Sequence, residues 1–361
     1  MINTTYYQDL TKMNTFGMKV KARCFIEYDS VADLVDIEFE ELARPVLHIG
    51  GGSNLLFTDD FKGTVLHSKI NFIEILDAET RHSEEQGDVA ISSKVLVSVG
   101  AGVVFDDFCD WAAKEGLWGV ENLSYIPGEV GASAVQNIGA YGVEVKDVIK
   151  TVYCYDTIDE EFVNFDVEDL EYGYRDSAFK DPEIKGRYIV THVVFALSRT
   201  PQPKLDYGHL KEAVYCHSER SEESLTPSLI RKVIIKIRKE KLPEPSVMGS
   251  AGSFFKNPVI SAEHYARIEA AAKAEYGADC KVPHYDLPDG TVKVPAAWMI
   301  EQCGWKGKRS GNAAVYDKQP LVIVNYTGEA YPEEIISLER RIISSVKAKF
   351  DVELHPEVDH I

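Results

Sequence analysis

Residues 125–142 read YIPGEVGASAVQNIGAYG, a stretch whose backbone is kept bare by small residues at Gly128, Gly131, Ala132, Gly139 and Gly142. The run has neither the 3.6-residue period of an amphipathic helix nor the alternation of a strand. Glycine in a surface loop brings no packing of its own, and long irregular loops are uncommon in compact domains unless they have a function. We therefore expect this segment to lie against a bound ligand, and an extended irregular loop is the alternative.

A second glycine-rich segment, Gly50-Gly51-Gly52-Ser53-Asn54, directly follows the apolar residues Val46–Ile49, which we expect to form a buried strand. This order suggests a dinucleotide-binding turn, but Leu55 occupies the position of the third glycine and no acidic residue lies within three positions of Ile70. The exposed backbone N–H groups could still form a nest for a pyrophosphate. A plain tight turn is the alternative interpretation.

Outward from these segments, the first 200 residues favour strands at Val95–Val99, Thr151–Tyr155 and Tyr188–Leu197, with a helix at Asp106–Glu115. Strands and a helix separated by glycine loops predict an α+β fold.

The second half is richer in helices. We expect a helix that starts at Thr226-Pro227, three more at Ser261–Tyr276, Pro295–Cys303 and Glu333–Phe350, and a strand at Leu321–Asn325. These elements predict an α/β second domain over residues 201–345. Two polar stretches, Asp77–Ser93 and His217–Ser228, look like surface insertions, and the second has too few apolar residues to order strongly.

Composition restricts the function classes. The formal charge of −19 argues against a general affinity for nucleic acid, which needs a basic face. The six cysteines are scattered, a pattern that predicts reduced thiols in a cytoplasmic protein rather than disulfides or a metal site. We expect no membrane segment, because the chain has no run of about 18 apolar residues. Motifs of NTPases, α/β-hydrolases and zinc proteases are absent.

Three short motifs carry reactive side chains, and each has an ordinary alternative. Arg175 follows two tyrosines and could clamp a carboxylate with two hydrogen bonds, or it could pair with Asp176 at the surface. Ser253 stands in a glycine turn close to Lys256, which alone is compatible with simple turn chemistry. Glu357 lies near the end of the sequence, where a glutamate is usually just solvated.

Taken in chain order, these motifs resemble the UDP-N-acetylenolpyruvoylglucosamine reductase family, in the subclass with a tyrosine-bearing loop over the substrate. The resemblance rests on segments from one end of the chain to the other: Asn14–Gly17, Gly50–Asn54, Ile126–Gly142, Gly173–Phe179, Tyr207–Leu210, Lys241–Pro245, Gly252–Pro258 and Pro356–Val358. It implies an FAD-binding fold of the vanillyl-alcohol-oxidase type, with subdomains 1–68 and 69–200, a substrate domain 201–345 and a tail 346–361 that returns to the active site.

The same resemblance implies non-covalent FAD, with NADPH as hydride donor. It assigns FAD binding to Gly50, Gly51, Gly52, Ser53 and Asn54 and to Pro127, Gly128, Gly131, Ala132, Asn137, Gly139, Ala140, Tyr141 and Gly142. Hydride would pass from the flavin N5 to C3 of the enolpyruvyl group of a UDP-sugar, in peptidoglycan precursor synthesis. The implied partners are these small molecules alone, and a monomer is expected.

By position, the family's roles would make Ser253 the proton donor to C2, and Arg175 and Glu357 stabilisers of the enol-type intermediate. Substrate contacts would come from Tyr174, Tyr207, Arg238, Lys241, Asn257, Tyr285 and Gln302. A hydride added beside a carboxylate builds charge that an arginine can accept, and the alpha carbon then needs a placed acid. The rival hypotheses are an oxidase on the same fold, for which His48 is the candidate flavin tether, and a non-catalytic binding protein.

Overall fold

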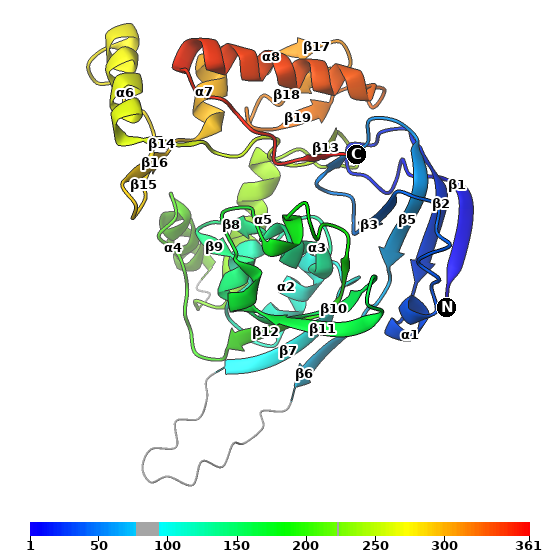
Figure 1. The fold of residues 1–361 in the computed structure, drawn as a ribbon. Coiled ribbons are helices and arrows are strands. Elements are labelled where there is room, and N and C mark those ends of the chain that lie inside the picture. The colour runs from blue at the N-terminus through cyan, green and yellow to red at the C-terminus, as the bar shows by residue number, and fades with distance from the viewer. Residues whose placement is uncertain (77–93, 222–223) are drawn as a thin grey trace, which may run out of the picture. The chain divides into compact units, whose positions relative to one another are not determined.

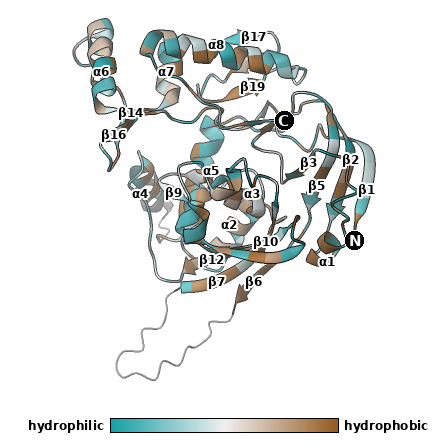
Figure 2. Cartoon of the chain, in the orientation of Figure 1, coloured by the Kyte–Doolittle hydropathy of each residue, from teal (hydrophilic) through white to brown (hydrophobic). Residues whose placement is uncertain are grey.

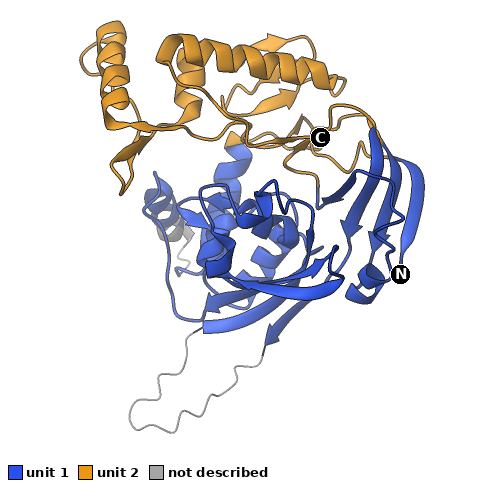
Figure 3. Cartoon of the chain, in the orientation of Figure 1, with its two compact units in different colours: residues 1–8, 22–51, 61–240 blue, residues 9–21, 52–60, 241–361 orange. Residues whose placement is uncertain are grey.

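The computed structural model describes residues 1–76, 94–221 and 224–361, which form two compact units (Figure 3). Unit 1 comprises residues 1–8, 22–51 and 61–240, and unit 2 comprises residues 9–21, 52–60 and 241–361. This division differs from the boundaries expected at 68, 200 and 345, which stay predictions. Residues 201–240 belong to unit 1 because Leu205, Leu210, Val214 and Ile230 pack with Trp118 in one buried cluster.

The first sheet of unit 1 has the strand order β1-β2-β5-β3, formed by β1 (Asn3–Asp9), β2 (Lys21–Tyr28), β5 (Phe61–Ser68) and β3 (Val46–Ile49) (Figure 1). Strand β5 is parallel to both β2 and β3. The short helix α1 (Val31–Val35) begins where the Ser30 hydroxyl accepts a hydrogen bond from the Asp33 N–H, and its Leu34 is buried beside Leu66 of β5. The strand expected at Val46–Ile49 is confirmed.

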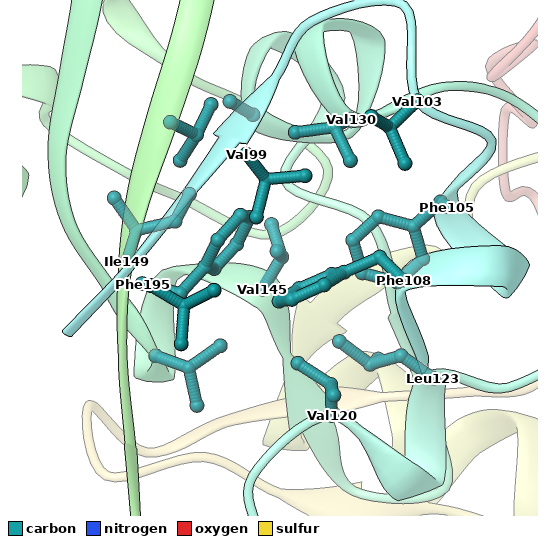
Figure 4. Packing of buried hydrophobic residues seen from close by; sticks show 14 of the residues in the cluster. Val99, Val103, Phe105, Phe108, Val120, Leu123, Val130, Val145, Ile149 and Phe195 are labelled. Carbon is teal, nitrogen blue, oxygen red and sulfur yellow. The ribbon is translucent and has the colours of Figure 1, made fainter. Parts of the chain in front are cut away.

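The second sheet of unit 1 is antiparallel, in the order β11-β10-β12-β7-β6. Its strands are β6 (Ile73–Leu76), β7 (Lys94–Gly100), β10 (Ile149–Asp156), β11 (Glu161–Asp166) and β12 (Tyr188–Ser198). The helices α2 (Phe105–Lys114) and α3 (Val130–Gln136) cover one face. Phe108 of α2 is fully buried against Phe195 of β12, with ring centroids 4.7 Å apart (Figure 4). Burying such a side chain contributes about 1.5–3 kcal/mol.

Short elements complete unit 1, followed by two longer helices. The hairpin strands are β8 (Gly139–Ala140) and β9 (Val143–Glu144), and the 3-10 turns span Glu121–Leu123, Val145–Asp147, Val167–Leu170 and Ala178–Lys180. Helices α4 (Leu210–Ser221) and α5 (Pro227–Lys241) follow.

The expected insertion at 217–228 overlaps the ends of these helices, and its residues 222–223 lie outside the described residues. Residues 217–221 extend α4, and Pro227 begins α5 while the Leu229 N–H donates to the Thr226 hydroxyl oxygen. Leu225 of this stretch packs into the cluster that includes Trp118, and the assignment as an insertion stays a prediction. The other expected insertion, 77–93, lies outside the described residues.

Unit 2 contains the antiparallel sheet β13-β19-β18-β17, made of β13 (Gly249–Ser250), β19 (Ile323–Asn325), β18 (Ala313–Val315) and β17 (Arg309–Ser310). The long helix α8 (Pro332–Phe350) packs along it and mixes polar and apolar residues, as a helix with one buried face does (Figure 2). A smaller sheet joins β14 (Val259–Ser261), β16 (Thr291–Lys293) and β15 (Tyr285–Asp286), and a short pair joins β4 (Leu55–Leu56) to β20 (Asp359–His360). Because the larger sheet is antiparallel, this unit is better described as α+β than as the expected α/β.

The helix ends of unit 2 follow the local signals. Helix α6 (Ala262–Tyr276) starts where the Ser261 hydroxyl accepts from the His264 N–H at 3.1 Å, and it ends at Gly277. Helix α7 (Ala296–Gln302) also lies where it was expected. Among the residues that the structure describes, no helix is both long and apolar enough to cross a bilayer.

Candidate active site

The segment 125–142 is more regular than its sequence suggests, because it contains helix α3. The helix begins after Glu129 and ends at Asn137, which has the left-handed φ of 44° that favours asparagine and glycine. The periodicity argument missed it because a run of glycine and alanine has no amphipathic stripe. Tyr125 (φ 62°) and Tyr141 (φ 49°) are also left-handed, which costs about 1–3 kcal/mol each and is typical of functional sites.

Gly50 and Gly51 of the first glycine segment meet the second segment inside unit 1. A Cβ atom built on Gly51 would lie 3.4 Å from the Cα of Gly128, and one on Gly50 would lie 3.2 Å from the Cβ of Ala132. Side chains at these glycines would therefore fill the space where the two bare backbones approach each other. Two bare backbone segments that approach each other in this way fit a pyrophosphate-bearing cofactor such as FAD.

A buried polar network supports this junction, and no sequence pattern predicted it. The His67 ring lies 3.0 Å from Glu27 through Nδ1 and 3.0 Å from Glu129 through Nε2. Burial opposes the charged ring, but the two carboxylates outweigh it and raise the pKa of His67. Nearby, His48 Nε2 lies 2.7 Å from the Tyr28 hydroxyl, and burial lowers the pKa of His48 to about 4.

Arg175 lies on a tight turn against the second glycine segment. Gly173 and Asp176 close the turn with reciprocal backbone hydrogen bonds of 3.1 and 3.2 Å, and Arg175 between them has a left-handed φ of 56°. Its guanidinium donates to the Gly139 carbonyl oxygen at 2.6 Å and to that of Asn137 at 3.4 Å. The ring of Tyr174 lies 5.7 Å from the guanidinium carbon. The turn thus presents a cation beside residues 137–139.

Arg238 and two tyrosines extend this cationic region in unit 1. Arg238 Nε donates to the Tyr125 carbonyl oxygen at 3.0 Å, and burial, with a smaller effect of Arg175, lowers its pKa. Burial raises the pKa of Tyr141, and Arg238 opposes that shift. Tyr207, 45% exposed, packs edge-on against Tyr141 with centroids 6.0 Å apart. Two arginines among tyrosine hydroxyls can bind an anionic ligand.

In unit 2 the backbone brings Ser253 close to Glu357. The Glu357 N–H donates to the carbonyl oxygen of Phe254 at 2.8 Å, and the Lys256 N–H donates to that of His355 at 2.9 Å. The terminal segment is fixed further by Asn54, whose Nδ2 donates to the Glu357 carbonyl oxygen at 3.0 Å. Both main-chain polar groups of Glu357, its N–H and its carbonyl oxygen, are therefore hydrogen-bonded, unlike those of a solvated terminal glutamate.

The remaining predicted residues are divided between the units. Unit 1 holds the exposed Pro127 and the half-buried Ala140 and Tyr174. Gly52, Ser53 and Asn54 belong to unit 2. Also in unit 2, Asn257 Oδ1 accepts from the Ala296 N–H at 2.9 Å, and Gln302 ends α7 with its carbonyl oxygen 3.3 Å from Lys349 Nζ. Tyr285 and Lys241 are exposed. In the described ranges, no three His, Cys, Asp or Glu residues are placed to hold a metal ion.

Comparisons with known proteins agree with the geometry. Residues 22–165 match a family model described as "FAD binding domain", and residues 244–361 match "UDP-N-acetylenolpyruvoylglucosamine reductase, C-terminal domain". The chain is 49% identical over 353 residues to the UDP-N-acetylenolpyruvoylglucosamine reductase of Bacteroides fragilis, covering 98% of each chain. It is 43% identical to that of Porphyromonas gingivalis, covering 98% of this chain and 97% of the other. The chain belongs to this reductase family.

The solved reductase of Thermus caldophilus has the same fold, with a TM-score of 0.63 at 22% identity, covering 100% of this chain and 98% of the other. The predicted α+β FAD-binding fold is confirmed. As a member of this family, the protein is an FAD-dependent oxidoreductase of peptidoglycan precursor synthesis that acts on small molecules.

Proposed function

We propose that this reductase uses NADPH to convert the enolpyruvyl group of UDP-N-acetylglucosamine enolpyruvate to the lactyl ether of UDP-N-acetylmuramate, with Ser253 as the proton donor. FAD, when bound, would supply the hydride that adds to C3 of the enolpyruvyl group. The observation that supports the proposal is the backbone hydrogen bond between Glu357 and Phe254, the residue that follows Ser253, because it makes the two segments neighbours within unit 2.

Ser253 suits the role of a placed acid because its neighbours fix its backbone. Phe254 is fully buried, Phe255 is 1% exposed, and the Phe254 N–H donates to the Leu321 carbonyl oxygen at 2.8 Å. Ser253 itself is only half-buried. We propose that its hydroxyl delivers a proton to C2, and that Glu357 stabilises the enol-type intermediate with Arg175.

The residues of unit 1 would hold the anionic parts of the ligands. Arg175 would take up the charge that develops on the substrate carboxylate, since its planar fork can donate two parallel hydrogen bonds. Tyr174, Tyr207 and Arg238 would bind the UDP-sugar, together with Lys241, Asn257, Tyr285 and Gln302 of unit 2.

Cytoplasmic location also remains part of the proposal. The six cysteines are free, as expected for a reducing compartment. The monomeric state stays a prediction.

The test of the chemistry separates the two half-reactions of Ser253→Ala. In anaerobic stopped flow, NADPH should bleach the flavin of the variant at nearly the wild-type rate, because that step needs no proton at the substrate. Reoxidation by the enolpyruvyl substrate should slow by about 10²–10⁴-fold, the range for a lost general acid. Ser253→Cys should recover part of the rate, because a thiol is the stronger acid.

The matched control is Ser345→Ala, which removes a hydroxyl bonded to the Arg341 carbonyl oxygen within α8 and should change neither half-reaction. Normal reoxidation of Ser253→Ala would make Ser253 a turn residue. If NADPH does not bleach the flavin of Ser253→Ala, the Ser253 hydroxyl serves the flavin or NADPH site instead.

A further inference from the structure

The Asn137 side chain is fully enclosed and bonded on every side by protein. Nδ2 donates to the Gly173 carbonyl oxygen at 2.7 Å and to Glu144 Oε2 at 3.0 Å. Oδ1 accepts from the Lys146 N–H at 3.3 Å. An amide has two donor hydrogens and one carbonyl oxygen, so these three bonds engage all of its polar groups. The side chain therefore joins three separate segments: the end of α3, the start of the turn at 145–147, and the turn that carries Arg175.

The Arg175 turn is attached to Asn137 twice. The Gly173 carbonyl oxygen accepts both from the Asp176 N–H, which closes the turn, and from the Asn137 side chain. In the other direction, the Arg175 guanidinium donates to the backbone oxygens of Asn137 and Gly139. Because a left-handed arginine is strained, its conformation persists only where the surroundings hold it. Asn137 stabilises the turn through hydrogen bonds from its side chain to Gly173 and from the Arg175 guanidinium to its backbone oxygen.

We propose that Asn137 is a positioning residue for Arg175: its side-chain amide fixes the turn 173–176 so that the guanidinium is set for the substrate carboxylate. The proposal rests on the proposed function of Arg175, and it gives Asn137 a different role from the FAD contact expected from the sequence. Asparagine is suited here because it accepts the left-handed conformation at the end of α3 and offers two donors. Aspartate has nearly the same shape but offers only acceptors, which would face the Glu144 carboxylate and the Gly173 carbonyl.

The test compares Asn137→Asp with Asn312→Asp. Asn312 Nδ2 also donates to a glutamate carboxylate, that of Glu334, at 3.2 Å, so the same charge conflict arises in unit 2, whereas Arg175 belongs to unit 1. Both variants should lose stability. Only Asn137→Asp should slow flavin reoxidation by substrate, by at least about tenfold, while bleaching by NADPH changes less than about threefold. The slowing should appear in kcat rather than in KM. If Asn137→Asp does not fold, Asn137→Gly keeps the left-handed backbone and removes the same donors.

A double-variant cycle with Arg175→Lys makes each outcome decisive. If Asn137 holds the turn, the urea midpoint of the double variant should lie no lower than that of Asn137→Asp alone, because the turn is already released. Normal reoxidation of Asn137→Asp beside a slow Arg175→Lys overturns the inference and leaves the proposed function intact. If Arg175→Lys reoxidises normally, the proposed role of Arg175 fails. If the losses in urea midpoint of the two single variants then add up in the double variant, the positioning role of Asn137 is overturned as well. An Asn137→Asp protein that folds but has lost FAD also overturns it, since Asn137 would then serve the cofactor.

Discussion

Replacing Gly52 with alanine should destabilise the protein more than replacing Gly17, although both glycines belong to unit 2 and have nearly the same backbone conformation, with φ of 59° and 67°. A left-handed alanine costs about 1–2 kcal/mol at either position. At Gly17 the new Cβ atom would meet nothing within 4 Å. At Gly52 it would lie 2.0 Å from the Met13 carbonyl oxygen, where real contacts are essentially never under 3.0 Å. The backbone must therefore move by about 1 Å, and such overpacking adds about 1–3 kcal/mol. We expect losses of about 1–2 kcal/mol for Gly17→Ala and about 2–5 kcal/mol for Gly52→Ala.

Urea unfolding of both variants, followed by tryptophan fluorescence at a fixed FAD concentration, measures the difference. The shift must also move residue 52, whose carbonyl oxygen accepts from the Thr15 N–H at 3.1 Å. Because the first glycine segment is a proposed FAD site, Gly52→Ala should also retain less FAD after gel filtration than Gly17→Ala. Equal midpoints for the two variants would refute the reasoning, because the overlap with Met13 would then cost nothing.

Three further predictions follow from single residues. Arg175→Lys should reduce turnover by at least about a hundredfold while NADPH still bleaches the flavin, because one ammonium cannot replace the two-pronged guanidinium; near-normal turnover would return Arg175 to a surface role. Tyr207→Phe should weaken substrate binding modestly, and substrate should slow proteolysis near residue 207 in the wild type, whereas equal cleavage with and without substrate would contradict a closing loop. Since the pKa of His48 is about 4 in the folded chain and ordinarily 6.5, the unfolded state binds more protons between these values, so stability should fall as the pH drops from about 6.5 towards 4. Urea midpoints at pH 7 and pH 5 should show a smaller fall for His48→Gln than for the wild type, because the variant lacks the group that binds an extra proton on unfolding. His67, with its raised pKa, contributes the opposite slope in both proteins.

Elements with strong local signals could be predicted closely. The Ser261 cap and the Gly277 stop predicted the ends of α6. The apolar stripe of Ile335, Leu338 and Ile342 predicted α8, and all three side chains are fully buried. Where a local signal was weak, prediction failed. Helix α3 has no apolar stripe, so the hydrophobic period did not predict it.

By itself, the sequence determined the family, the glycine segments and most helix ends, because capping residues, hydrophobic period and bare backbone act over a few residues. Only the tertiary structure decided which segments meet. The Asn54 side chain reaches the Glu357 backbone across 303 positions, and His67 joins Glu129 across 62. It also decided that Asn137 faces Glu144 and Gly173 instead of lying open to a ligand. Such contacts depend on how sheets and helices pack, and a hydrogen bond between residues far apart in the chain leaves no pattern in either local sequence.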